Sequence, residues 1–450
     1  MNKNYLFVYP SIDYKKKGIN IYRFDGTISP ENFFDVKDKK FFNNSEYIVI
    51  SKNAYDYIYR HIGTWQRWLR NEVDNINKFR ELHSLVLKII IWLKEKKISK
   101  VLQFTAAPHH VDTALIEIAS RIIGIKSIFF YCEDVITSTY LPIYRNEFKF
   151  EYLYFDKIKN SSTEIKKVIS EWQENLKINK RDDWTRKISF YKKNILIASL
   201  YIFYWHIKKK FFDTKVNNIV QREIGLFGDL KSLINQKKYL KYLSSKNKIN
   251  KCQFVSEFNN IVIYGNYQPE STTLSEGGDF RDQIDILKFL NQSGYKGNIF
   301  YKEHKCSFLC IERVIGPTRV GLWKNKNFYN NLNKYNAKLI LEDSGISNSI
   351  IITCTGSIAI ERSLQGLKTV VCGYPWYGEM PGTIRLEDIK WDDKDLVNSF
   401  IGSSEKIRKD SEKYLANLLS YGLIRDLNKK NAKLHSSYTI KDFLDLFLKT

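Results

Sequence analysis

The sequence has few of the residues that build metal sites and disulfide frameworks. Its six cysteines include no pair separated by two residues, and with seven histidines they fit no spacing typical of a structural metal site. The chain starts with a short apolar run that predicts a β-strand and lacks the long apolar core of a signal peptide. We therefore expect a reduced, cytoplasmic protein with no metal and no cofactor.

Residues 195–207 form an apolar, aromatic-rich run that is too short to cross a bilayer. The run has about thirteen residues, whereas a membrane-spanning helix needs about 20. Lysines flank it at 192, 193 and 208–210. Such a segment suits either a membrane surface or a helix buried between two domains, and the sequence leaves both open. We expect peripheral association with the cytoplasmic face of the inner membrane.

Positive charge is the feature present in excess. The chain has 450 residues and a net charge of +23, and residues 151–250 contain 22 Lys and Arg against 10 Asp and Glu. Such a block indicates an anionic partner, either nucleic acid or phospholipid, or else a lysine-rich composition bias. The block shows no recognised nucleic-acid-binding motif, so we expect no nucleic acid among the partners. A basic nucleic-acid-binding protein is the alternative from another class.

Strand and helix patterns alternate along the first 150 residues, which predicts a parallel sheet. The predicted strands are residues 5–9, 47–51, 101–105 and 126–131, and the predicted helices are 79–97 and 113–123. Loops at the carboxyl ends of parallel strands gather functional residues. This position selects His109, His110, Asp112, Glu133 and Asp134 as candidate functional residues of the first half.

The same alternation resumes in the second half and predicts a second doubly wound domain. Its predicted strands are 260–265, 298–302, 338–341 and two within 349–373, and its predicted helices are 282–292 and 328–334. The expected organisation is an N-terminal α/β domain over residues 1–250, a C-terminal α/β domain over 251–425, and a C-terminal helix over 426–450. The first includes a basic, partly amphipathic helical segment at about 155–250.

A strand-to-helix turn at Thr355-Gly356-Ser357 is the most informative feature of the second half. An apolar run stops at this turn, and a helical pattern with Glu361 on its first turns follows. Backbone N–H groups, two hydroxyls and a helix start would meet at one point, which is typical of a phosphate site.

Two further segments are predicted to line the same end of this sheet. One contains Gln268-Pro269-Glu270 and, close behind, Gly277-Gly278-Asp279, where the glycines allow a backbone to approach a ligand. The other, Lys302-Glu303-His304, delivers ionisable side chains from a strand end. The lysine and histidine can neutralise a leaving phosphate.

These motifs, with Tyr374-Pro-Trp-Tyr377, resemble bacterial capsule and lipopolysaccharide glycosyltransferases that use CMP-activated 2-keto sugars, the Kdo transferases and sialyltransferase-like enzymes. The resemblance covers roughly residues 255–380. It implies a GT-B architecture, two Rossmann-like domains facing a cleft, with acceptor glycan bound by the first and nucleotide sugar by the second. By this resemblance His304, Thr355 and Ser357 would hold the CMP phosphate, and Lys302 and Glu303 would flank the nucleotide. Here Lys305 stands where the family has a proline.

The expected activity is transfer of a 2-keto sugar acid of the Kdo, sialic or pseudaminic type from its CMP donor to a glycan or glycolipid, without a metal. Candidate catalytic residues are Glu133 as base, Glu270 as donor-side carboxylate, and His304. The candidate donor-binding set is Gln268, Gly277, Gly278, Asp279, Lys302, Glu303, Thr355, Gly356, Ser357 and Glu361. An alternative is a UDP-sugar enzyme, either a transferase or one resembling UDP-N-acetylglucosamine 2-epimerases, in which Glu361 would hold the ribose.

Overall fold

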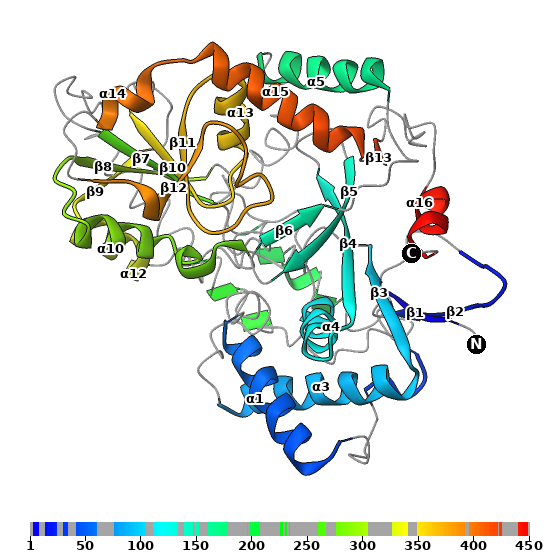
Figure 1. Cartoon of the computed structure of the whole chain (residues 1–450). Helices are drawn as coiled ribbons and strands as arrows, with labels where there is room; N and C mark the ends of the chain where they lie inside the picture. Colours follow the sequence, from blue (N-terminus) through cyan, green and yellow to red (C-terminus); the bar gives the residue numbers. More distant parts are fainter. Residues whose placement is uncertain are drawn as a thin grey trace. The chain divides into compact units, whose positions relative to one another are not determined.

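The structure is a computed structural model of the whole chain (Figure 1). It describes residues 3–8, 14–24, 30–34, 42–60, 76–104, 111–133, 139–146, 149–152, 161–177, 196, 199–200, 202–204, 206–207, 226–227, 230–231, 234, 260–266, 276–304, 326–340, 349–391, 396–421, 423–424 and 440–448.

The chain divides into two compact units. Unit 1 contains residues 1–172, 215–222 and 415–450, and unit 2 contains residues 173–214 and 223–414. The expected boundaries at 250 and 425 lie outside the described residues and stay predictions. The sequence did not suggest one feature of this division: residues 415–450 return to unit 1.

Unit 1 is built on a seven-stranded sheet with a parallel core. The parallel strands lie in the order β2 (Ile19–Phe24), β1 (Lys3–Val8), β3 (Ile98–Gln103) and β4 (Lys126–Glu133). Three antiparallel strands extend it: β5 (Thr139–Asn146), β6 (Lys149–Tyr152) and β13 (Leu423–Ile424). The order 2-1-3-4 is that of flavodoxin-like sheets.

Three helices, α1 (Asn44–Arg60), α3 (Ile76–Glu95) and α4 (Val111–Ile122), pack together over this sheet (Figure 1). Alternate residues of β1 divide between the two faces, as the pleat of a strand requires. Leu6 and Val8 join the helices in the core, whereas Tyr5 donates a hydrogen bond to the Leu448 carbonyl at 3.3 Å. Leu448 follows α16 (Ile440–Phe447), so the end of the chain is fixed to its first strand.

The strand predicted at residues 47–51 is wrong, because these residues lie within helix α1. Asn43 caps the helix by accepting the Glu46 N–H at 2.6 Å, an arrangement typical of helix starts. The core-facing residues Ile50, Ala54 and Ile58 recur every four positions, so the burial follows a helical period. A window of five residues was too short to distinguish this pattern from a strand.

Unit 2 is built on a six-stranded sheet in which every pair is parallel. The strands are β7 (Asn260–Tyr264), β8 (Asn298–Lys302), β9 (Ala337–Ile340), β10 (Ile350–Thr353), β11 (Thr369–Val371) and β12 (Thr383–Arg385). They lie in the order β12-β11-β10-β7-β8-β9. Counted from β7, this is the 3-2-1-4-5-6 order of Rossmann folds, with its switch point between β7 and β10.

Helices cover both faces of this sheet. Ile261, Ile263 and Tyr301 share a core with α10 (Ile284–Gln292) and α12 (Lys326–Lys334), whereas Val262 packs with α13 (Ile358–Leu364) on the other face. The helices after β11 are α14 (Leu396–Ile401) and α15 (Glu405–Ser420), and α5 (Ser162–Lys177) follows β6. The expectation of two α/β units is confirmed, with a wholly parallel sheet in unit 2 and a mixed sheet in unit 1, where β5, β6 and β13 are antiparallel. The cleft between them stays a prediction.

Within the described residues, no helix is both long enough and apolar enough to cross a membrane.

The fixed C-terminal helix yields a pH-dependent prediction. Asp445 accepts hydrogen bonds from Lys16 Nζ at 2.5 Å and Tyr14 OH at 2.7 Å, and these lower the pKa of its carboxyl from 3.8. A lowered folded pKa gives stability that is complete above pH 3.8 and is lost as pH falls through the lowered value. We expect faster amide exchange in α16 of Asp445→Asn at neutral pH, and no difference from wild type in strong acid.

The control is a double-mutant cycle with Lys16→Gln. Because both side chains are about one-third exposed, the coupling should be small, about 0.2–1 kcal/mol. Additive effects of the two substitutions at neutral pH would contradict the interaction.

Candidate functional site

Rossmann folds bind ligands at the switch point of the sheet, and in unit 2 the residues that follow β7, β8 and β10 lie at this edge. Directly after β7, the Gly265 N–H donates to the Lys302 carbonyl at 2.8 Å. A Cβ at this position would collide with the Tyr301 hydroxyl and would lie 2.9 Å from the Lys302 carbonyl oxygen. Glycine therefore lets the chain pass close to β8 and places Asn266 at the sheet edge.

A chain of side-chain hydrogen bonds crosses this edge. The Tyr301 hydroxyl donates to Gln283 Oε1, Gln283 Nε2 donates to Asn266 Oδ1 at 3.1 Å, and Asn266 Nδ2 donates to Thr355 Oγ1 at 3.1 Å. We call these four residues the polar chain. The first three are buried, and Thr355 is half-buried. Because the Thr355 oxygen accepts a hydrogen bond from Asn266, the hydrogen of the Thr355 hydroxyl points away from Asn266.

The turn after β10 is held in place from two sides. The Gly356 N–H donates to Thr353 Oγ1 at 3.1 Å, and the Tyr377 hydroxyl donates to the Gly356 carbonyl at 2.6 Å. The Ser357 hydroxyl donates to Glu361 Oε1 at 3.0 Å, one turn along α13. Since α13 has only seven residues, its dipole is not counted as an anion site. The candidate donors to an anion at this turn are the Thr355 hydroxyl and, once released from Glu361, the Ser357 hydroxyl.

Two buried cations of unit 2 have different partners. Lys302 is buried and its ammonium lies 4.4 Å from the centre of the Tyr264 ring, a cation–π contact. Arg362 donates to the Lys368 carbonyl at 3.1 Å and to Thr369 Oγ1 at 3.2 Å, which binds α13 to the start of β11. Burial raises the pKa of Tyr264 to about 12, so this phenol is neutral at physiological pH.

Glu303 positions the residue that follows it. Its carboxylate accepts the His304 N–H at 2.9 Å and the Tyr329 hydroxyl at 2.8 Å, and only 2% of the residue is exposed. The Glu303 N–H donates to the Ile340 carbonyl at 3.2 Å. These bonds fix the backbone of His304, whose side chain is half-buried at the end of β8.

The predicted glycine loop packs against another part of the protein backbone. The Tyr374 N–H donates to the Glu276 carbonyl at 2.6 Å, and a Cβ on Gly373 would lie 2.7 Å from Gly277 Cα. Gly278 has a left-handed φ of +53°, which favours glycine. Gly277 thus packs against the backbone of Gly373, and Gly278 packs against the Tyr374 ring. Asp279 beside them is exposed.

The remaining predicted site residues fall into two groups. Five of them lie outside the described residues: Gln268, Glu270, His109, His110 and Asp134. The other two belong to unit 1. Glu133 ends β4, opposite Thr139 of β5. Asp112 lies in the first turn of α4, where its carboxylate accepts the Thr113 N–H at 3.0 Å.

The structure also shows members of the site that the sequence analysis did not select. Asn266, Gln283 and Tyr301 lie 17 or more positions apart along the chain and meet only in the folded sheet. A usable signal existed for Asn266, because a polar residue directly after a buried strand and a glycine is typical of a ligand-facing edge.

The buried thiols of unit 2 take no part in this edge as reactive groups. Cys354 and Cys372 are buried free cysteines, and burial raises the pKa of the Cys372 thiol well above its usual value. Across the described part of the chain, no group of three or more His, Cys, Asp or Glu residues is placed to hold a metal ion.

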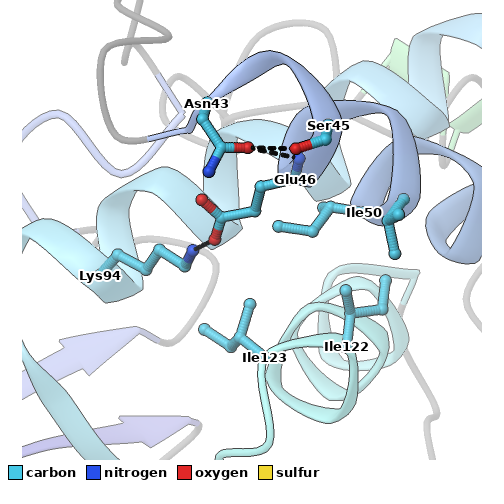
Figure 2. Close-up of a pocket in the computed structure, with 8 residues that line it drawn as sticks. Asn43, Ser45, Glu46, Ile50, Lys94, Ile122 and Ile123 are labelled. Atoms are coloured by element: carbon cyan, nitrogen blue, oxygen red, sulfur yellow. Dashed lines mark hydrogen bonds and ion pairs between the residues drawn. The ribbon is translucent and has the colours of Figure 1, made fainter.

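A hollow of about 530 Å³ lies elsewhere, between α1, α3 and α4 of unit 1 (Figure 2). It lies where α3 and α4 end, next to the starts of β3 and β4, and so at the opposite edge from the one that binds ligands in such sheets. Its charged groups, Lys94 and Glu46, are paired with each other, and Asn43 caps α1. The remaining lining residues include Ile50, Ile122 and Ile123. We place no site there.

The close passage of β7 past β8 predicts the effect of Gly265→Ala. The added methyl group would collide with the Tyr301 hydroxyl, so the variant should lose about 1–3 kcal/mol of unfolding free energy. Gly402→Ala is the matched control, since a Cβ there meets nothing within 4 Å. It should be neutral or slightly stabilising in the same urea titration. Equal stability of the two variants would contradict the described packing of this edge.

Comparisons with known proteins add little to this geometry. The sequence matches no protein-family model and no curated protein. Among solved structures, the chain is similar to one titled "Thermosulfurimonas dismutans KpsC, beta Kdo 2,7 transferase", with 10% sequence identity and a TM-score of 0.33. The similarity covers 81% of this chain and 90% of that one. At these values it supports no argument about function.

Proposed function

We propose that this chain is a glycosyltransferase that binds a nucleotide-activated sugar at the carboxyl edge of the unit 2 sheet. The observation that carries the proposal is the polar chain at the switch point between β7 and β10, because nucleotides bind at switch points of such sheets. Its last member, Thr355, presents a hydroxyl beside Ser357. The resemblance of the surrounding motifs to surface-polysaccharide glycosyltransferases supports the choice of reaction.

The turn after β7 favours a nucleotide sugar over a dinucleotide cofactor. In dinucleotide-binding Rossmann folds the first strand is followed by G-x-G-x-x-G, whose glycines let the pyrophosphate approach the backbone. Here β7 is followed by Gly265-Asn266-Tyr267-Gln268-Pro269-Glu270. A side chain, Asn266, occupies this edge and continues the polar chain to the turn after β10.

The proposed donor is a CMP-activated 2-keto sugar, and the described residues suggest how its phosphate is held. The Thr355 hydroxyl would donate to a phosphate oxygen, and the Ser357 hydroxyl would do the same by giving up its hydrogen bond to Glu361. Lys302 and His304, both at the end of β8, would offset the charge that develops on the departing CMP. Glu303 would act indirectly, because its carboxylate holds the His304 backbone.

The chemical step then follows from the donor. A base takes the proton of the acceptor hydroxyl, the acceptor oxygen bonds to the anomeric carbon, and the carbon–oxygen bond to CMP breaks with its electron pair left on the phosphate. We propose Glu133 as this base and Glu270 as the donor-side carboxylate. His109, His110 and Asp112 would contact the glycan or glycolipid acceptor.

The first test is nucleotide binding by Thr355 variants. CMP should raise the melting temperature of the wild-type chain. Thr355→Val removes the hydroxyl and the acceptor of Asn266 Nδ2, so CMP affinity should fall about tenfold to a hundredfold. Thr355→Ser is the matched control and should keep both interactions. Isothermal titration with CMP and with UDP measures the effect.

The outcomes separate the alternatives. Binding of UDP but not CMP would show that the proposed CMP donor is wrong. It would favour a UDP-sugar enzyme, with Glu361 as the ribose contact. If neither nucleotide binds, or if Thr355→Val binds like wild type, the proposed site is wrong.

The second test concerns His304 and turnover. His304→Ala should lower kcat for CMP release from CMP-Kdo, CMP-sialic acid or CMP-pseudaminic acid by about 10²–10³-fold, because it removes a group that stabilises the leaving phosphate. Its unfolding should change little, since the side chain is only half-buried. His83→Ala, which removes a contact to Ser51 in unit 1, is the matched histidine control and should keep kcat. Wild-type turnover by His304→Ala would contradict the proposed role.

A further inference from the structure

The apolar run at residues 195–207 has a helical backbone wherever it is described. Residues 196, 199, 200, 202–204, 206 and 207 are all helical. Five of them are large, apolar or aromatic and exposed, and we call them the outer stripe: Leu196, Leu200, Phe203, Tyr204 and Ile207. Their spacing of four, three, one and three positions places them on one side of a helix with 3.6 residues per turn.

Apolar residues lie on both the buried and the exposed side of this helix. Ile202 is 0% exposed, so its side of the helix packs into the protein. Leu200 is 69% exposed and Tyr204 is 61% exposed, on the side away from Ile202. The outward side of a surface helix normally carries polar residues. A continuous exposed apolar stripe of this kind marks a binding surface.

The charge around the helix indicates what the stripe binds. Lys192 and Lys193 precede it, Lys208, Lys209 and Lys210 follow it, and it lies in the block with 22 basic and 10 acidic residues. A protein partner or a second copy of this basic chain would have to bring acidic groups to this flank. An anionic bilayer offers hydrocarbon to the stripe and phosphate headgroups to the lysines at the same time.

We propose that the outer stripe binds the surface of an anionic phospholipid bilayer. The helix lies parallel to the membrane, with Leu200, Phe203 and Ile207 inserted at the boundary between headgroups and acyl chains. Tyr204 places its ring there with the hydroxyl toward water, and the flanking lysines contact headgroup phosphates. The contact is independent of the proposed function, because no stripe residue belongs to the candidate site.

The test is co-sedimentation of the full chain with vesicles of phosphatidylcholine, with or without phosphatidylglycerol. Wild type should sediment with the phosphatidylglycerol vesicles. Leu200→Glu and Phe203→Glu should each weaken binding about tenfold, because each places a charge where an apolar group was buried in lipid. Both positions are exposed, so the melting temperatures should match wild type. CMP titration then checks the unit 2 site separately.

Ile48→Glu is the matched control, since Ile48 is as exposed as the stripe residues but lies on α1. It should bind vesicles like wild type. Replacing the five flanking lysines by glutamine should remove the preference for phosphatidylglycerol. The proposal is overturned if the stripe variants bind vesicles like wild type, if high salt alone abolishes all binding, or if light scattering shows a dimer that Leu200→Glu dissociates.

Discussion

The burial of one hydroxyl group sets the arrangement of the whole candidate site. Tyr301 is fully buried in the unit 2 sheet, and burial raises its pKa well above the usual value, so the phenol stays protonated and must donate. An unpaired buried donor costs about 1–3 kcal/mol, and Gln283 meets this requirement. Gln283 in turn fixes Asn266, which fixes Thr355. The need to pair a buried donor in the core thereby fixes side chains as far as the sheet edge, where it orients the Thr355 hydroxyl.

The sequence predicted the elements of unit 2 well because apolar runs there are bounded by clear turns. Residues 298–302 were predicted as a strand, and β8 has the same bounds. It predicted less of the site, because the polar chain joins residues from β8, the start of α10 and the edge of β7. Such partners are set by strand order, and no local pattern encodes strand order. The return of β13 to the first sheet was missed for the same reason.

Glycines show why a motif alone gives an ambiguous prediction. Gly277 and Gly278 suggested a backbone that approaches a ligand, and the folded chain supplies another reason for both. A Cβ on Gly373 would lie 2.7 Å from Gly277 Cα, and a Cβ on Gly278 would lie 3.1 Å from the Tyr374 ring. Gly265, which no motif singled out, has the same property against Tyr301. A glycine in a motif indicates that another group passes close to the backbone. Only the folded structure shows whether that group is a ligand or another part of the protein.

Positive charge occurs in two different surroundings in this chain, as buried cations in unit 2 and as a lysine-rich block at residues 151–250. In unit 2, Arg362 is bound to a backbone and a hydroxyl oxygen at the start of β11, and Lys302 lies against the Tyr264 ring at the end of β8. Both cations are buried, so each is held in one place by its contacts. The block at 151–250 instead carries many lysines around an exposed apolar stripe, which suits a diffuse anionic surface. Under the two proposals, removing charge from the block weakens the contact with phospholipid and leaves nucleotide binding at the unit 2 site unchanged.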